Sequence, residues 1–79
     1  MDHESYMRQA LELAWEAAAA GEVPVGCVIV KDGEVIGRGR NRREEKQAAF
    51  SHAEMESIAQ ANAHMGSWRL EGASLYVTL

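Results

Sequence analysis

The dipeptide Asp32-Gly33 constrains the fold of this 79-residue chain more than any other feature. It lies between an apolar run rich in β-branched residues, Val25–Val30, and a second run, Glu34–Arg40. Asp-Gly supplies the positive φ angles of a two-residue turn, so the two runs are predicted to pair as a hairpin. Because the first run is apolar almost throughout, we expect its strand to be buried on both faces.

A helix is predicted before the hairpin, from about Glu4 to Ala20. Gly21 follows it as a left-handed C-terminal cap, and Pro24 lies just beyond. Its expected buried stripe has three- and four-residue spacing and consists of Met7, Ala10, Leu11, Ala14, Ala17 and Ala18.

A second helix is predicted after the hairpin. The polar stretch from Asn41 to about Phe50 has no periodicity and is expected to be a loop, so the helix would begin at Ser51 or His52 and end at Met65. Its mostly apolar face would comprise Met55, Ile58, Ala59 and Asn62, and Gly66 would be its C-terminal cap.

Residues 73–79 are expected to form a third strand, which gives the order α-β-β-α-β. This order predicts a layered α/β domain whose helices cover a mixed sheet. The sequence stops at Leu79, inside an apolar strand, so we expect the chain to be a fragment of a larger domain.

Composition excludes several classes of protein. The net charge of −4 argues against a strongly basic nucleic-acid binder, although it leaves room for a local basic patch. No apolar run approaches the roughly 18–20 residues that span a bilayer, and the acidic N-terminus does not resemble a secretory signal. The lone Cys27 precludes an internal disulfide, so the expected location is the cytoplasm.

The segment Ser51-His52-Ala53-Glu54 is the strongest candidate for chemistry. At the start of a helix, the imidazole of His52 and the carboxylate of Glu54 could reach one point, where a zinc-bound water would become a nucleophile. Glu54 could then move the proton of that water. The alternative is a capping box formed by Ser51 and Glu54, with His52 exposed; the residues alone favour it, because zinc sites take at least three protein ligands.

The order of several longer stretches resembles the cytidine deaminase superfamily, and within it the bacterial tRNA adenosine deaminases. The matching stretches are Glu22-Val23-Pro24-Val25-Gly26, Gly39-Arg40-Asn41-Arg42, His52-Ala53-Glu54-Met55, Gly66-Ser67-Trp68-Arg69-Leu70 and Leu75-Tyr76-Val77-Thr78-Leu79. The resemblance implies a three-layer α/β/α fold with a mixed sheet, of which residues 1–79 are the N-terminal α-β-β-α-β portion.

The resemblance also implies roles for individual residues. His52 would be the single histidine ligand of zinc, and Glu54 the general acid and base. Asn41 would hydrogen-bond the target nucleoside, Val23 would form an apolar wall of the base pocket, and Leu79 would lie near that pocket. Without the resemblance, Asn41 would be an ordinary loop cap, while Val23 and Leu79 would simply pack in the core.

The family signature continues with Glu-Pro-Cys-x-x-Cys, whose two cysteines supply the other zinc ligands, and this half is absent from the chain. Cys27 is expected to be a buried, inert thiol that cannot replace them. The fragment alone is therefore not expected to deaminate. Ala48-Ala49-Phe50 also departs from the Asp-Pro-Thr of many relatives, which leaves the shape of this loop open.

The implied activity is zinc-dependent hydrolysis of adenosine to inosine at the wobble position of tRNA. The implied partners are a tRNA anticodon stem-loop and a second copy of the chain. Arg38, Arg40, Arg42 and Arg43 could contact phosphates, or form a solvated strand end. Two alternatives stay open: a deaminase of free guanine or cytosine bases or nucleosides, and an inactive truncated or split fragment.

Overall fold

The computed structural model describes residues 3–42, 46–66 and 72–78. Its elements are α1 (His3–Ala19), β1 (Gly26–Lys31), β2 (Glu34–Arg40), α2 (Lys46–Met65) and β3 (Ser74–Val77). The predicted α-β-β-α-β order is therefore confirmed, and α1, β1 and β2 lie within one residue of their predicted bounds. The Asp-Gly turn is also confirmed, because Asp32 and Gly33 have φ angles of 51° and 76°.

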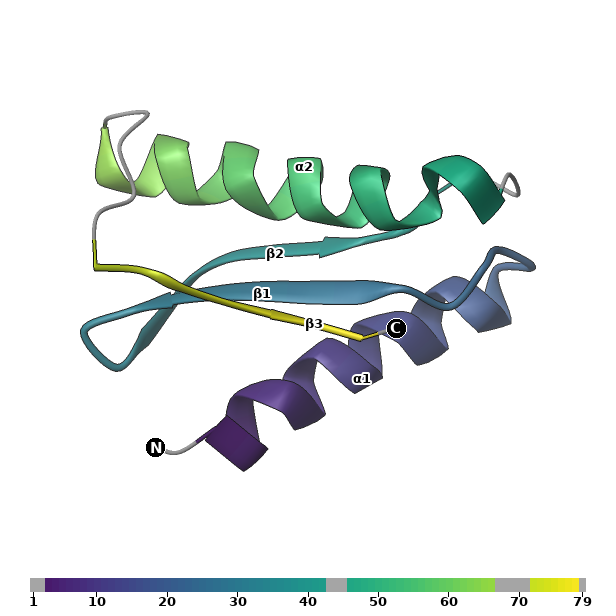
Figure 1. Cartoon of the computed structure of the whole chain (residues 1–79), viewed down its shortest axis with the longest axis horizontal. Helices are drawn as coiled ribbons and strands as arrows, with labels where there is room; N and C mark the ends of the chain where they lie inside the picture. The colour runs from purple at the N-terminus through teal and green to yellow at the C-terminus, as the bar shows by residue number, and fades with distance from the viewer. Residues whose placement is uncertain (1–2, 43–45, 67–71, 79) are drawn as a thin grey trace.

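The sheet has the order β2-β1-β3, and β1 pairs with both neighbours in antiparallel register. Both pairings among the described strands are thus antiparallel, and the parallel pairing of a mixed sheet is not found within them. Figure 1 shows α1 on one face of this sheet and α2 on the other, which gives the expected three layers.

Strand β1 is buried on both faces, as its apolar run predicts. Val28 and Val30 pack with Tyr6 and Ala10 in a cluster on the α1 side of the sheet. The intervening residues of β1 turn to the α2 side, where Ile29 packs with Ala61 of α2. The central strand therefore joins two hydrophobic layers.

The buried stripe of α1 differs from the predicted one. Its buried residues are Tyr6, Ala10, Ala14 and Ala17. Leu11 is 42% exposed and Ala18 is exposed, so both were wrongly assigned to the core. The physical reason is that Gly26 brings β1 against the backbone of α1, where only small side chains fit. Tyr6 fills the space further along the helix.

The buried face of α2 is also rotated from the predicted one. Ala53, Ser57 and Ala61, spaced by four residues, are fully buried, whereas Met55 is 68% exposed. These small residues face Gly37 and Gly39 of β2, and Figure 1 shows α2 running over β2. A hypothetical Cβ on Gly39 would lie only 2.0 Å from the carbonyl oxygen of Ala53. Close backbone packing, rather than large apolar side chains, therefore seats this helix.

Helix α2 begins at Lys46, five or six residues before its predicted start. The expected loop up to Phe50 is wrong over this stretch, and so is the placement of Ser51 as a helix cap. Lys, Gln and Ala, which make up residues 46–49, are all good helix formers, so this stretch carries a propensity signal even without apolar periodicity. Gly66, with a φ of 69°, ends the helix as predicted.

Some predicted features lie outside the described residues. These are the pocket residue Leu79, the basic residue Arg43 and the segment that contains Trp68 and Arg69. Across residues 3–42, 46–66 and 72–78, no helix is both long enough and apolar enough to cross a membrane.

Candidate functional site

The candidate site lies at the end of the sheet where β1 begins and where β2 and β3 end. Gly26 pairs with Arg40 across the hairpin. On the other side, the Gly26 N–H donates to Thr78 Oγ1 at 2.9 Å, and the Thr78 N–H donates to the Gly26 carbonyl at 2.9 Å. These bonds gather the residues around Val23, Asn41 and Thr78, which are far apart in sequence, at one edge.

Helix α2 passes over this edge at Ala53. Ala53 is fully buried and packs in a cluster with Val25 and Cys27, against which Val23 and Val77 also pack. His52 and Glu54, on either side of it in sequence, are each half-buried. The structure therefore brings all the described candidate site residues to one end of the sheet.

The predicted convergence of His52 and Glu54 on one water stays a prediction, and both residues lie several positions after the start of α2 at Lys46. In a regular helix, residues two apart differ in direction by about 200°. His52 lines a hollow of about 400 Å³ together with Arg40, Arg42, Met55 and Glu56, and Glu54 is not among its lining residues. The prediction placed both residues at the helix start, whereas the structure places them beyond the first turn of α2.

Glu54 instead lies within electrostatic reach of the buried thiol of Cys27. Burial raises the pKa of Cys27 above its ordinary value; the hydrogen bond with Ser57 opposes this, and the charge of Glu54 adds to the increase. Cys27 Sγ lies 3.1 Å from Ser57 Oγ, which also donates to the Glu54 carbonyl at 2.8 Å. The prediction of a buried thiol is confirmed, and its raised pKa keeps it protonated and unreactive.

Asn41 is fully buried and fixes the loop that precedes β1. Its side-chain amide donates to the Val23 carbonyl at 3.1 Å, and its backbone N–H donates to the Val25 carbonyl at 3.0 Å. These two bonds match the loop-cap interpretation of Asn41. They also place Val23 and Asn41, the two residues assigned to the base pocket, in direct contact.

Both sequence neighbours of Asn41 form ion pairs that sequence patterns missed, and Arg40 also lies 3.9 Å from Glu16. Arg40 Nη1 lies 2.9 Å from Glu22 Oε1, and both side chains are less than one-fifth exposed. Arg42, which is more exposed, is paired with Glu56 of α2. Hydrogen bonding and charge from Glu56 raise the pKa of Arg42, so this guanidinium stays charged. One signal was available for Glu56. It follows His52 by four residues, so both lie on one face of the helix and Glu56 could have been placed near the candidate site.

The described residues do not form a zinc site by themselves. Among residues 3–42, 46–66 and 72–78, no group of three or more His, Cys, Asp and Glu side chains is placed to hold a metal ion. Cys27 is buried beside Ser57 and is not among the residues that line the hollow of His52. A zinc ion at His52 would thus need ligands other than those described.

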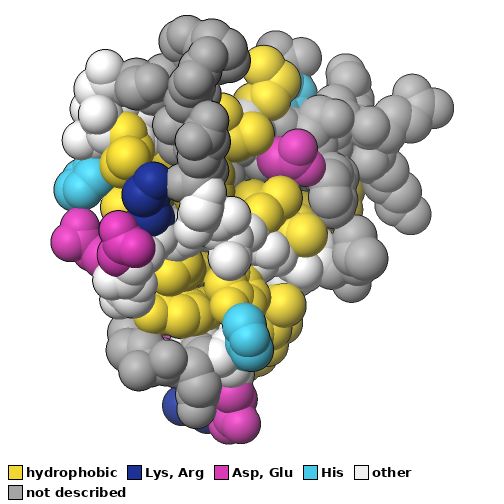
Figure 2. All heavy atoms as spheres, turned by 60° about the vertical axis from the view of Figure 1, so that its left-hand side comes forward, with side chains coloured by type: hydrophobic (Ala, Val, Ile, Leu, Met, Phe, Trp, Pro, Cys, Tyr) yellow, Lys and Arg dark blue, Asp and Glu magenta, His cyan; other side chains and the backbone are white. Residues whose placement is uncertain are grey.

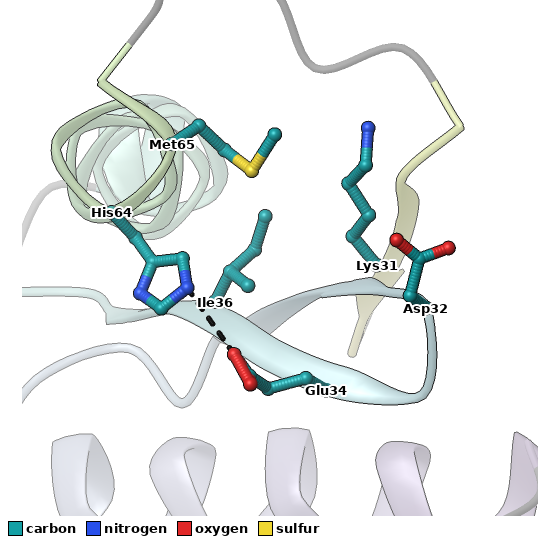
Figure 3. A pocket seen from close by; sticks show the side chains of 6 residues that line it. All are labelled: Lys31, Asp32, Glu34, Ile36, His64 and Met65. Atoms are coloured by element: carbon teal, nitrogen blue, oxygen red, sulfur yellow. Dashed lines mark ion pairs between the residues drawn. The ribbon is translucent and has the colours of Figure 1, made fainter.

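A second hollow, of about 220 Å³, lies at the other end of the sheet. It is bounded by the hairpin turn and the C-terminal end of α2, and Figure 3 shows His64 of the helix reaching toward Glu34 of β2. Their atoms Nε2 and Oε1 are 3.2 Å apart. Figure 2, which brings this end forward, shows hydrophobic side chains surrounded by charged and histidine side chains. His64 is thus a partly exposed surface residue.

Comparison with known protein families identifies the class of domain. The model of the cytidine and deoxycytidylate deaminase zinc-binding region matches residues 1–79. The chain belongs to this family. The family resemblance and the α/β fold expected from the sequence are thereby confirmed.

Two curated relatives in this family are named tRNA-specific adenosine deaminase. The one from Streptococcus pyogenes is 54% identical over 74 residues, which is 94% of this chain and 46% of the relative. The one from Bacillus subtilis is 51% identical over 76 residues, which is 96% of this chain and 47% of the relative. The chain thus spans a little under half the length of both relatives.

Solved structures of the family share the same fold. A guanine deaminase from Bacillus subtilis superposes with a TM-score of 0.83 at 37% identity, over 98% of this chain and 50% of that one. A structure from studies of A-to-I editing by tRNA deaminases at the wobble position superposes with a TM-score of 0.85 at 42% identity, over 99% of this chain and 60% of that one.

Proposed function

We propose that the whole protein containing residues 1–79 deaminates adenosine to inosine in tRNA, at the wobble position of an anticodon stem-loop. Residues 1–79 would be the N-terminal part of its single deaminase domain. The similarity to tRNA-specific adenosine deaminases over 94% of the chain supports the substrate. The structural observation that carries the proposal is the seating of Ala53, with His52 and Glu54 beside it, against the strand ends that hold Val23 and Asn41.

The reaction is a hydrolysis. Water adds at C6 of the adenine ring, the C6–N bond breaks, and the amino group leaves as ammonia. We assign Glu54 to carry a proton from the attacking water to the leaving nitrogen, so it begins and ends the cycle as a carboxylate. The target base must leave its stack for C6 to become accessible.

Zinc belongs to this proposal through the family, whose description names a zinc-binding region. When bound, zinc lowers the pKa of water so that hydroxide forms near neutral pH. His52 would be one ligand, and two cysteine ligands would come from outside residues 1–79. For that reason we expect the isolated chain 1–79 to be inactive.

The base pocket would use the residues at the edge of the sheet. Val23 offers an apolar wall, and the carboxamide of Asn41 holds the carbonyl of Val23 in place. A hydrogen bond from Asn41 to the nucleoside would be additional to these contacts. Leu79, next to Thr78, is proposed to contribute to the same pocket.

Contact with tRNA is supported by the position of Arg42. Its side chain is 56% exposed and lines the hollow beside His52, so it could meet a phosphate next to the target base. Arg40 is a poorer candidate, because its side chain is only 18% exposed and paired with Glu22.

A homodimer in the cytoplasm is also proposed. The exposed side chains of Leu11 and Trp15, one turn apart on α1, support a covered surface on this helix. Light scattering of the whole protein tests the dimer, and a monomer at micromolar concentration would contradict it.

The function is tested with the whole protein purified with zinc. A stem-loop with adenosine at the wobble position should yield inosine, detected by mass spectrometry of its nucleosides. Glu54→Gln should lower kcat by at least about 100-fold with unchanged zinc content, as expected for loss of a general acid and base. His52→Ala should lose zinc as well as activity. Inosine formation that persists in Glu54→Gln would refute the assignment.

A second candidate is deamination of free guanine, favoured by the close superposition on a guanine deaminase. In that reaction water replaces the amino group of guanine, which gives xanthine and ammonia. Free guanine, cytosine and the stem-loop should therefore be compared at equal concentrations. Turnover of guanine without turnover of the stem-loop would select this alternative.

A further inference from the structure

Glu56 stands out among the residues of the hollow, because one carboxylate contacts both neighbours of Asn41. Its Oε1 accepts the backbone N–H of Arg40 at 3.2 Å. Its two oxygens also accept the Nε–H and an Nη2–H of Arg42. These contacts connect α2 directly to the end of β2, on each side of Asn41.

Glu56 lies on the same helix as the proposed site residues His52 and Glu54. Glu56 lies one helical turn after His52 and two residues after Glu54. Its side chain is 27% exposed, so solvent screens its charge only in part. A shift of α2 along β2 would strain the bonds of Glu56 to Arg40 and Arg42.

Glu56 also protects a strand edge that would otherwise be open. Because β2 is the outer strand of the order β2-β1-β3, the N–H of Arg40 faces away from β1 and finds its acceptor in α2. Gln60 does the same for the N–H of Arg38, at 3.0 Å, one turn further along the helix. Glu56 and Gln60 thus form two successive hydrogen bonds between α2 and β2, and that of Glu56 is the one beside the candidate site.

We propose that Glu56 is a positioning residue: by holding Arg40 and Arg42, it sets Asn41, and with it Val23, at a fixed place relative to the helix turn of His52 and Glu54. This inference rests on the proposed function for its consequence in catalysis. It goes beyond that function because Glu56 belongs neither to the proposed base pocket nor to the proton transfer. It is assigned the alignment of that pocket with Glu54.

Alignment of this kind affects rate more than stability. A displacement of about 1 Å between a bound substrate and a catalytic group costs on the order of 100-fold in rate. Glu56→Ala should lower kcat/KM for the stem-loop by at least about tenfold. Gln60→Ala removes the neighbouring hydrogen bond, to the Arg38 N–H, and should leave kcat/KM within about twofold of wild type.

A double-mutant cycle separates positioning from a general loss of structure. If Glu56 acts through Asn41, Glu56→Ala should cost less than about twofold in an Asn41→Ala background, because the group it positions is gone. If the two losses simply multiply, the proposal is overturned. Glu56→Gln keeps an acceptor for the Arg40 N–H and should lose less than Glu56→Ala; equal losses would also overturn it. Should Glu56→Ala fail to fold, Glu56→Gln replaces it in the cycle.

A structural measurement tests the role of Glu56 without any assay of deamination, so it remains valid if the proposed function is wrong. The side-chain amide of Asn41 can be followed by nuclear magnetic resonance in the whole protein labelled with ¹⁵N-asparagine, and assigned by its loss in Asn41→Ala. Its signals should move toward those of a free amide in Glu56→Ala and stay in place in Gln60→Ala. Unchanged signals in Glu56→Ala would overturn the proposal whatever the substrate is.

Discussion

The contact between Gly39 and α2 gives the sharpest test of the packing. We consider the substitution Gly39→Ala in the whole protein. The φ of Gly39 is not in the left-handed region, so alanine fits the backbone conformation without strain. Fewer unfolded conformations would make alanine slightly stabilising if there were space for its methyl group. Any loss of stability must therefore come from the contact itself.

The structure sets the size of that contact. The added Cβ would lie 2.0 Å from the Ala53 carbonyl oxygen and 2.8 Å from the Ser57 backbone nitrogen, where ordinary contact begins at 3.4 Å. Helix α2 would have to retreat by about 1.4 Å, and both clashing atoms are backbone, so no rotamer change relieves them. Overpacking typically costs 1–3 kcal/mol, and we expect about 3 kcal/mol here.

Urea denaturation followed by circular dichroism measures this loss as a fall in the free energy of unfolding. Gly33→Ala is the matched control, because a Cβ there meets nothing within 4 Å and costs only the left-handed backbone conformation, about 1 kcal/mol. Since α2 carries His52 and Glu54, Gly39→Ala should also lower deamination, whereas Gly33→Ala should not. A loss at Gly39 no greater than that at Gly33 would refute the close seating of α2 on β2.

Two further predictions concern buried and paired groups. Because burial raises the pKa of Cys27 above 9.0, an unfolded thiol ionises first as the pH rises, so the stabilising contribution is complete below about pH 9 and is lost above it. Unfolding free energies at about pH 8 and pH 10 should therefore differ more in wild type than in Cys27→Ala, and equal differences would contradict the buried state of this thiol. Glu22→Gln should cost about 1–2 kcal/mol in urea denaturation, since it leaves Arg40 half-paired in a mostly buried place. Its control, Glu4→Gln, breaks an exposed pair with Arg8 and should cost less than about 0.5 kcal/mol; similar costs for the two would contradict the difference in burial.

Turns and helix ends could be predicted from the sequence, because a few residue types adopt the backbone conformations that these positions require. Asp32-Gly33 fixed the hairpin because few residues tolerate its φ angles, and Gly21 and Gly66 ended the helices for the same reason. The buried faces of both helices were predicted less well. Hydrophobicity pointed to Leu11 and Met55, whereas the structure buries alanine and serine against glycines of the sheet. Such a close approach depends on which glycine meets which helix, and this pairing exists only in three dimensions.

The sequence likewise indicated which residues belong to the candidate site better than it indicated their arrangement. The His-Ala-Glu motif pointed to His52 and Glu54, and the family resemblance pointed to Asn41 and Val23. The structure gathers these residues at one end of the sheet, but α2 begins earlier than predicted. In a helix that starts at Lys46, His52 lines one hollow with Glu56, and the charge of Glu54 acts on Cys27. The net charge of −4 likewise concealed that two arginines beside Asn41 each have an acidic partner from a distant segment. Arg40 and Arg42 therefore hold the site together before they meet any phosphate, and an RNA that binds Arg42 must compete with Glu56 for it.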